Sequence, residues 1–187
     1  MENLISFGCS ITYGQWLSNP SDAWPIKLGN YLNKNPINLG VPGASNLEIL
    51  YNILNYNFSN TDTVIVMWSN PDRDLIYSED ENVRIGSWQE SELVKHWMLT
   101  HSEYDIANRS WLYFHHAKLF FESKKIKYYF FSIDIAYCNT FKPSYLDVDL
   151  FDVDVVTLRK ADVANDGSHP GPVSHELIAK EILKFIC

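Results

Sequence analysis

The segment Ile5–Gly14, with the sequence ISFGCSITYG, gives the clearest indication of the fold and contains the first candidate functional group. It opens within a short apolar run, Leu4–Phe7, of the kind that forms buried β-strands. The run ends in a turn of small residues that contains Ser10. We therefore predict a strand that leads directly into a tight turn, with the Ser10 hydroxyl presented at the carboxyl end of the strand.

A second polar motif, Asp166–Pro170 (DGSHP), lies near the other end of the chain. It places the His169 imidazole three residues after the Asp166 carboxylate. An acyl-transfer site needs a nucleophile, a general base and a group that orients the base, and serine, histidine and aspartate fill these roles. The sequence thus predicts Ser10 as nucleophile, His169 as base and Asp166 as orienter. Asp166 has an alternative role as a turn residue, because Asp-Gly is a common turn pair.

Four blocks of the sequence, taken together, resemble the SGNH hydrolases, the GDSL-type serine esterases. The blocks are Gly8–Gly14, Asn38–Ser45, Val64–Asn70 and Asp166–Pro170, in the family's order. The resemblance spans nearly the whole chain. It implies a three-layer α/β/α sandwich with a mostly parallel, flavodoxin-like sheet, and a carboxylic ester hydrolase that uses no cofactor.

The resemblance also implies an oxyanion hole, the set of donors that stabilises the negative oxygen of the tetrahedral intermediate. Its donors would be the backbone N–H groups of Ser10 and Gly43 and the side-chain amide of Asn70.

Four positions depart from the family pattern. Cys9 stands where the family usually has aspartate, Trp68 and Ser69 replace glycines, and Pro71 replaces another aspartate. A Cys9 thiol is an alternative nucleophile, but the register of the resemblance gives that role to the serine that follows it. The bulk of Trp68 should narrow the pocket, and we expect Trp68 and Trp88 to contact the substrate.

Composition limits the class of protein and its partners. The chain has 187 residues, of which 46% are hydrophobic and 20% charged, which suits one globular domain over residues 1–187. A net charge of −8 argues against nucleic acid and anionic membrane surfaces as partners. Acidic residues cluster at 79–81 and 147–154, where we expect solvated loops or faces.

The cysteines and histidines give no sign of a disulfide framework or a metal site. Cys9, Cys138 and Cys187 are scattered and odd in number, which favours a reducing compartment. No signal-peptide pattern and no apolar run of about 18 residues is present, so we expect a cytoplasmic protein. His115 and His116 are adjacent and would point about 100° apart on a helix, so we expect no metal.

Short apolar runs alternate with helical patterns along the chain. This alternation predicts a parallel sheet covered on both faces, with the site beyond the carboxyl ends of the strands. The helix that follows Ser45 is expected to bury Leu47, Leu50, Tyr51 and Leu54. The expected strands are Leu4–Phe7, Ile37–Leu39, Val64–Trp68 and Tyr128–Ile133, and the expected helices are 25–33, the segment after Ser45, 110–123 and 172–185.

Residues 71–108 interrupt this alternation. The segment is polar and carries two tryptophans, and we expect a helix around 91–99 but no strand. A long insertion of this kind is often functional, so we interpret it as a cap or rim over the site. Residues 134–165 form a second irregular stretch.

The sequence therefore favours a serine ester hydrolase acting on a small-molecule or carbohydrate ester, with acetyl or short acyl groups as the leading substrates. Two alternatives stay open. One is a catalytically idle binding module with the same fold, and the other is a lipid esterase or thioesterase of the same family.

Overall fold

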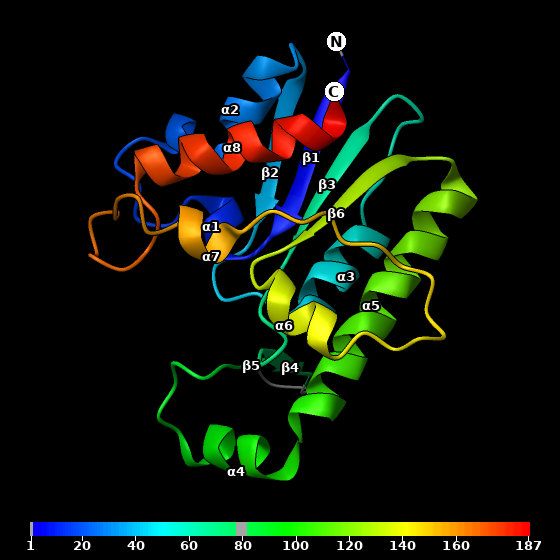
Figure 1. Cartoon of the computed structure of the whole chain (residues 1–187), viewed down its shortest axis with the longest axis vertical. Coiled ribbons are helices and arrows are strands. Elements are labelled where there is room, and N and C mark those ends of the chain that lie inside the picture. The colour runs from blue at the N-terminus through cyan, green and yellow to red at the C-terminus, as the bar shows by residue number, and fades with distance from the viewer. Residues whose placement is uncertain (1, 78–81) are drawn as a thin grey trace.

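A four-stranded parallel sheet forms the centre of the computed structural model, which describes residues 2–77 and 82–187. Its strand order is β2-β1-β3-β6, and all neighbours run parallel (Figure 1). The strands are β1 (Asn3–Gly8), β2 (Asn35–Gly40), β3 (Thr63–Trp68) and β6 (Lys127–Ser132). The four strands predicted from the sequence are confirmed, each within a few residues of its expected bounds.

The central strands are buried on both faces, which explains their continuous apolar sequences. All six residues of β3, TVIVMW, are buried, and so are five of the six residues of β1. Parallel strands joined by crossover helices leave no face of the sheet open to solvent, so alternation of polar and apolar residues is not required.

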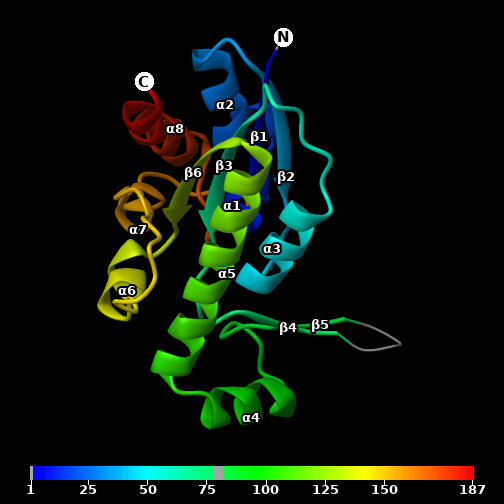
Figure 2. The same ribbon diagram turned by 90° about the vertical axis from the view of Figure 1, so that its right-hand side faces the viewer.

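Helices cover the two faces in pairs, as Figures 1 and 2 show. Helix α2 (Trp24–Tyr31) packs against α8 (Pro172–Ile186) on one face, and α3 (Asn46–Leu54) packs against α5 (Glu103–Lys124) on the other. The expected three-layer α/β/α arrangement is therefore confirmed. None of the described helices combines the length and the apolar character needed to cross a membrane.

Helix α3 begins where the sequence predicts but buries a different face. The Ser45 hydroxyl accepts a hydrogen bond from the Glu48 N–H at 3.2 Å, so Ser45 is the N-cap. The expected face was wrong in part, because Tyr51 and Leu54 are exposed. The buried hydrophobic residues of the helix are Ile49, Leu50 and Ile53.

The segment 71–108 lies beyond the carboxyl edge of the sheet, at the bottom of Figure 1. The expected helix is present as α4 (Glu92–Thr100), but the absence of strands was a wrong expectation. Short strands β4 (Asp74–Ile76) and β5 (Val83–Ile85) pair antiparallel. Strands of three residues, each with one charged residue among two apolar ones, are too short to give a strand signal in the sequence. The acidic residues 79–81 lie outside the described residues.

A second, smaller hydrophobic cluster holds this segment together. It consists of Ile85, Val94, Trp97 and Ile106, which come from β5, α4 and the first turns of α5. The remaining elements are short: α1 (Ser10–Tyr13), the 3-10 helix η1 (Pro20–Asp22), α6 (Ile135–Thr140) and α7 (Val155–Leu158).

His175 joins the two helices of one face and is fully buried. Its Nδ1 accepts a hydrogen bond from the Trp24 N–H at 3.2 Å, at the start of α2. Burial opposes a charge on the ring and lowers the pKa of His175 from 6.5 to about 4. The native fold thus requires the neutral imidazole.

This requirement predicts a loss of stability in mild acid. The unfolded chain takes up a proton at His175 below about pH 6.5, whereas the folded chain resists until about pH 4. The free energy of unfolding should therefore fall between pH 6.5 and pH 4, by about 2–3 kcal/mol from this group. Denaturant titrations at pH 7 and pH 4.5 should show a smaller loss in His175→Asn, which keeps an acceptor for Trp24. Equal losses in both proteins would contradict the assignment.

Candidate active site

Ser10 lies where the first strand turns into α1, as the sequence predicts. Strand β1 ends at Gly8, Cys9 caps α1, and Ser10 is its first residue. The turn needs glycine at position 8, because a Cβ there would lie 2.1 Å from the Thr12 Oγ1. Gly14 ends the helix in the left-handed conformation, with a φ of 80°. The glycines at both ends of the motif therefore shape the turn that carries the serine.

The thiol of Cys9 is buried and does not line the pocket next to Ser10. Its Sγ lies 3.9 Å from the Ser10 Oγ, which donates to it. The pocket is lined by Ser10 instead. This arrangement favours the hydroxyl over the thiol as the group that meets a ligand.

His169 and Asp166 are paired within one tight loop. The His169 Nδ1 lies 2.6 Å from the Asp166 Oδ2. The same carboxylate accepts hydrogen bonds from the Ser168 hydroxyl at 2.7 Å and from the backbone N–H of His169 at 3.0 Å. The loop is closed by Gly167, whose φ of +73° is in the left-handed region.

These hydrogen bonds fix the proton on the imidazole. The Ser168 hydroxyl, together with His169, holds the pKa of Asp166 well below its usual range, so the group is a carboxylate that can only accept. The proton between them therefore belongs to the His169 Nδ1. In the neutral ring this tautomer leaves the lone pair on Nε2, which is the form a general base needs.

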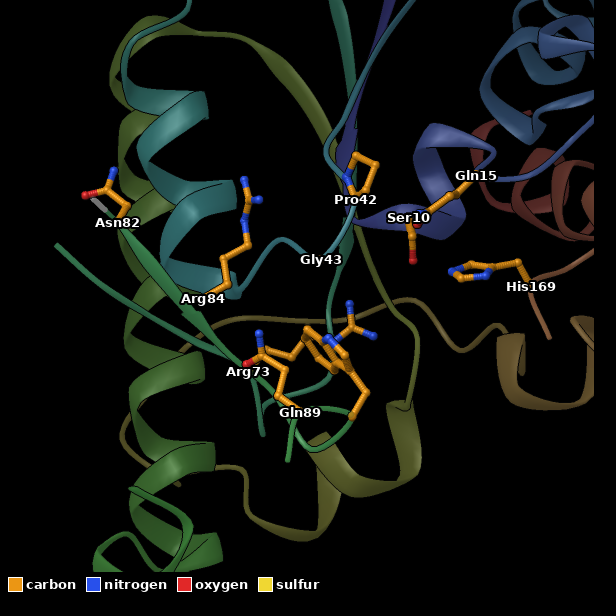
Figure 3. A pocket seen from close by; sticks show the side chains of 10 residues that line it. Ser10, Gln15, Pro42, Gly43, Arg73, Asn82, Arg84, Gln89 and His169 are labelled. Carbon is orange, nitrogen blue, oxygen red and sulfur yellow. The ribbon is translucent and has the colours of Figure 1, made fainter. Parts of the chain in front are cut away.

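Ser10, His169 and Gly43 line one pocket of about 560 Å³. Figure 3 shows the Ser10 hydroxyl and the His169 ring directed toward each other at one side of it. Among the described residues Ser10 and His169 share no hydrogen bond, and the hydroxyl instead contacts Cys9. Catalytic hydrogen bonds are often loose without a ligand. The two groups are thus together in one pocket, but their hydrogen bond is not formed.

Two backbone N–H groups beside the pocket are free to donate. Gly43 follows β2 with a φ of +75°, and its N–H donates to no acceptor among the described residues. The Ser10 N–H occupies the first position of α1, where no partner within the helix exists. Both could bind an oxyanion.

Asn70 is not brought to this pocket, contrary to the expectation from the sequence. It lines a separate cavity of about 400 Å³ with Asp72, Asp134 and Tyr137, among others. Its Oδ1 is buried and has no partner in the part of the chain that the structure describes. The amide therefore does not join Ser10 and Gly43 in this conformation.

The side chain of Asn46 fixes the backbone just before Asn70. Its Oδ1 accepts from the Ser69 N–H at 2.8 Å, and its Nδ2 donates to the Ser69 carbonyl at 3.1 Å. The chain then turns through Pro71, and the Arg73 N–H donates to the Asn70 carbonyl at 3.2 Å. The side chains at the two ends of this turn therefore line different cavities. Asn70 lines the cavity of about 400 Å³, and Arg73 lines the pocket that contains Ser10.

Trp68 is a second correction. Its side chain is fully buried, with ring centroids 4.5 Å from Phe114 and 5.5 Å from Phe130. A side chain without exposed surface does not contact a ligand, so Trp68 is a core residue. Trp88, by contrast, lines the pocket and is 49% exposed.

Sequence reasoning missed most of the remaining lining of the pocket. Half of its lining residues belong to the segment 71–108, which was expected to form a cap or rim. Apart from Trp88 these residues are polar and belong to no motif, so the sequence held no signal for them. The lining residues beyond those already placed are Gln15, Pro42, Arg73, Asn82, Arg84 and Gln89.

The described ranges hold no group of three or more His, Cys, Asp or Glu side chains placed to bind a metal ion.

Comparisons with known proteins connect this geometry to a fold. No family model matches the chain, and no curated protein does. Solved structures do match over nearly its whole length. A member of the lipolytic protein G-D-S-L family from Veillonella parvula DSM 2008 has a TM-score of 0.59 at 18% identity, covering 98% of this chain and 97% of its own.

Two other solved structures are similar. The psychrotrophic esterase EstA from Pseudoalteromonas sp., in a form inhibited by monoethylphosphonate, has a TM-score of 0.60 at 11% identity, covering 98% of this chain and 96% of its own. A two-domain esterase active on acetylated mannans, co-crystallised with mannopentaose, has a TM-score of 0.55 at 15% identity, covering 99% of this chain and 50% of its own. The chain therefore has the fold of the SGNH/GDSL hydrolases.

The pairing of Asp166 with His169 predicts the effect of Asp166→Asn. An amide can donate to Nδ1 and so favour the tautomer that carries its proton on Nε2, which cannot act as a base. Any ester hydrolysis should fall by about 10⁴-fold. The measurement is kcat on a chromogenic acetate, with circular dichroism as the control for folding. Near-normal turnover in a folded variant would show that Asp166 only shapes its turn.

Proposed function

We propose that this chain is a serine ester hydrolase that acts through Ser10, His169 and Asp166 on acetyl or short acyl esters of a carbohydrate or another small alcohol. The observation that carries the proposal is the shared pocket. Among the described residues it brings together a serine at the end of a strand, a histidine whose Nδ1 is paired with Asp166, and a Gly43 N–H that donates to no acceptor.

The mechanism follows from these groups. Ser10 Oγ attacks the ester carbonyl while the His169 Nε2 takes its proton, and Asp166 stabilises the imidazolium that forms. The N–H groups of Ser10 and Gly43 bind the oxygen that becomes negative. His169 then protonates the leaving alcohol, and water, activated by the same ring, releases the acyl group from Ser10.

The lining of the pocket supports a small, polar substrate. Trp88 and Pro42 are its large apolar side chains, and most of the others are polar or charged. An exposed indole also suits the face of a sugar ring. One solved structure with this fold is an esterase described as active on acetylated mannans.

A catalytically idle binding module is the second candidate, and the position of Asn70 favours it. Without that amide the oxyanion has two donors, and one lost donor typically costs about 2.7–4 kcal/mol of transition-state stabilisation. Covalent labelling separates the two functions. A fluorophosphonate should modify Ser10 in the hydrolase, whereas a folded but unlabelled and inactive protein would support the binding module.

The first prediction of the proposal concerns the nucleophile. Ser10→Ala should reduce hydrolysis of a chromogenic acetate to the background rate and abolish fluorophosphonate labelling, because the attacking oxygen is gone. The matched control is Cys9→Ala, which removes the neighbouring thiol and should lower activity only modestly. Loss of activity in Cys9→Ala with full activity in Ser10→Ala would instead indicate a thiol nucleophile.

The second prediction concerns the acyl chain. Because Trp88 and Pro42 are the only large apolar side chains among the described lining residues, and neither forms a long apolar channel with a second one, kcat/KM should be about tenfold or more higher for an acetate than for an octanoate of the same alcohol. A series of chromogenic esters from two to eight carbons measures this. A preference that rises with chain length would replace the acetyl-ester proposal with a lipid esterase or thioesterase.

A further inference from the structure

The pocket that contains Ser10 and His169 differs in charge from the rest of the chain. Two arginines, Arg73 and Arg84, line it, and no aspartate or glutamate is among its lining residues in the described ranges. The chain as a whole carries a net charge of −8. The pocket is therefore a local concentration of positive charge on an acidic protein.

One of the two arginines is already neutralised. The Arg84 Nε and Nη2 donate to the two carboxylate oxygens of Glu48, at 2.9 and 2.7 Å. This two-point pairing matches the geometry of both groups and compensates the charge locally. Arg84 therefore lines the pocket, but its charge is already paired with that of Glu48.

Arg73 has no such compensation. It forms no ion pair among the described residues, and its Nε and Nη1 are buried without a hydrogen-bond partner. Its guanidinium lies over the Trp88 ring, 4.6 Å from the ring centroid. Figure 3 shows both arginines across the pocket from His169. A cation partly removed from water and without a counterion attracts an anion more strongly than a solvated one.

We propose that Arg73 binds an anionic group of the substrate and so makes the site selective for negatively charged esters. The inference rests on the proposed hydrolase function. An acetyl group carries no charge, so the anionic group belongs to the alcohol part of the ester. The chemistry it requires is a carboxylate, a sulfate or a phosphate, each of which accepts hydrogen bonds from guanidinium.

A pair of chromogenic acetates tests this selectivity. 3-Carboxy-4-nitrophenyl acetate carries a carboxylate, and 4-nitrophenyl acetate is its neutral counterpart. The readout is the ratio of kcat/KM for the anionic ester to that for the neutral ester, and comparing this ratio between variants cancels the intrinsic reactivity of the two esters. Arg73→Gln should lower the ratio about tenfold or more, and Arg73→Lys should lower it less.

Lys95→Gln is the matched control, because it removes one positive charge from the same segment at an exposed position outside this pocket. It should leave the ratio unchanged. An unchanged ratio in Arg73→Gln, or equal losses on both esters, would overturn the inference while leaving the hydrolase proposal intact.

A binding measurement separates the inference from catalysis. Calorimetric titration with 5-hydroxy-2-nitrobenzoate, the alcohol released from the anionic ester, should show binding to the wild type that is weakened in Arg73→Gln. Such binding without ester hydrolysis would support the anion site and refute the hydrolase. Competition by acetate, sulfate and phosphate identifies the preferred anion, and failure of all three to compete would count against the site.

Discussion

The close approach of α1 to the ends of two neighbouring strands is the contact on which the rest of the site depends. Gly8 of β1 and Gly40 of β2 are paired in register, and a Cβ on Gly40 would lie 2.3 Å from the α1 backbone. Side chains at either position would push the helix away from the sheet. Because the helix lies so close, Ser10 is held at the edge of the sheet rather than above it. The Val41 N–H donates to the Gly8 carbonyl at 2.9 Å and ties the loop that carries Gly43 to the same edge.

The turn after β3 determines which side chain faces Ser10 across the pocket. Asn46 holds the backbone at the end of this strand, and the turn that follows closes between Asn70 and Arg73. One end of the turn faces the smaller cavity, and the other faces the pocket that contains Ser10. The pocket is therefore lined by the Arg73 guanidinium and not by the Asn70 amide that the sequence predicted there. The missing oxyanion donor and the positive charge of the pocket therefore both belong to this one turn.

The parts that could be predicted from the sequence are those that depend on burial and on local turns. The sheet was predictable because its central strands are mostly apolar and buried, and Ser10 was predictable because glycines frame its turn. Side-chain directions were not. The direction of Asn70 follows from the turn after Ser69, whose backbone is held by Asn46 of a distant helix, and Trp68 is a core residue because aromatic rings of α5 and β6 surround it. The β4–β5 pair was missed because its strands are short and partly polar.

Helix α5 has a mechanical consequence for the pocket. It has 22 residues and is about 33 Å long at about 1.5 Å per residue. Its first turns, with Ile106, belong to the small cluster, and from Trp111 onward its buried face belongs to the main core. Figure 2 shows that it extends from the sheet to α4 and connects the two. The segment that carries Trp88 therefore packs against one end of a long helix whose other end is held in the main core. A bend of this helix that left both clusters intact would move the segment with Trp88 relative to Ser10, so the width of the pocket depends in part on a helix that contributes no residue to its described lining.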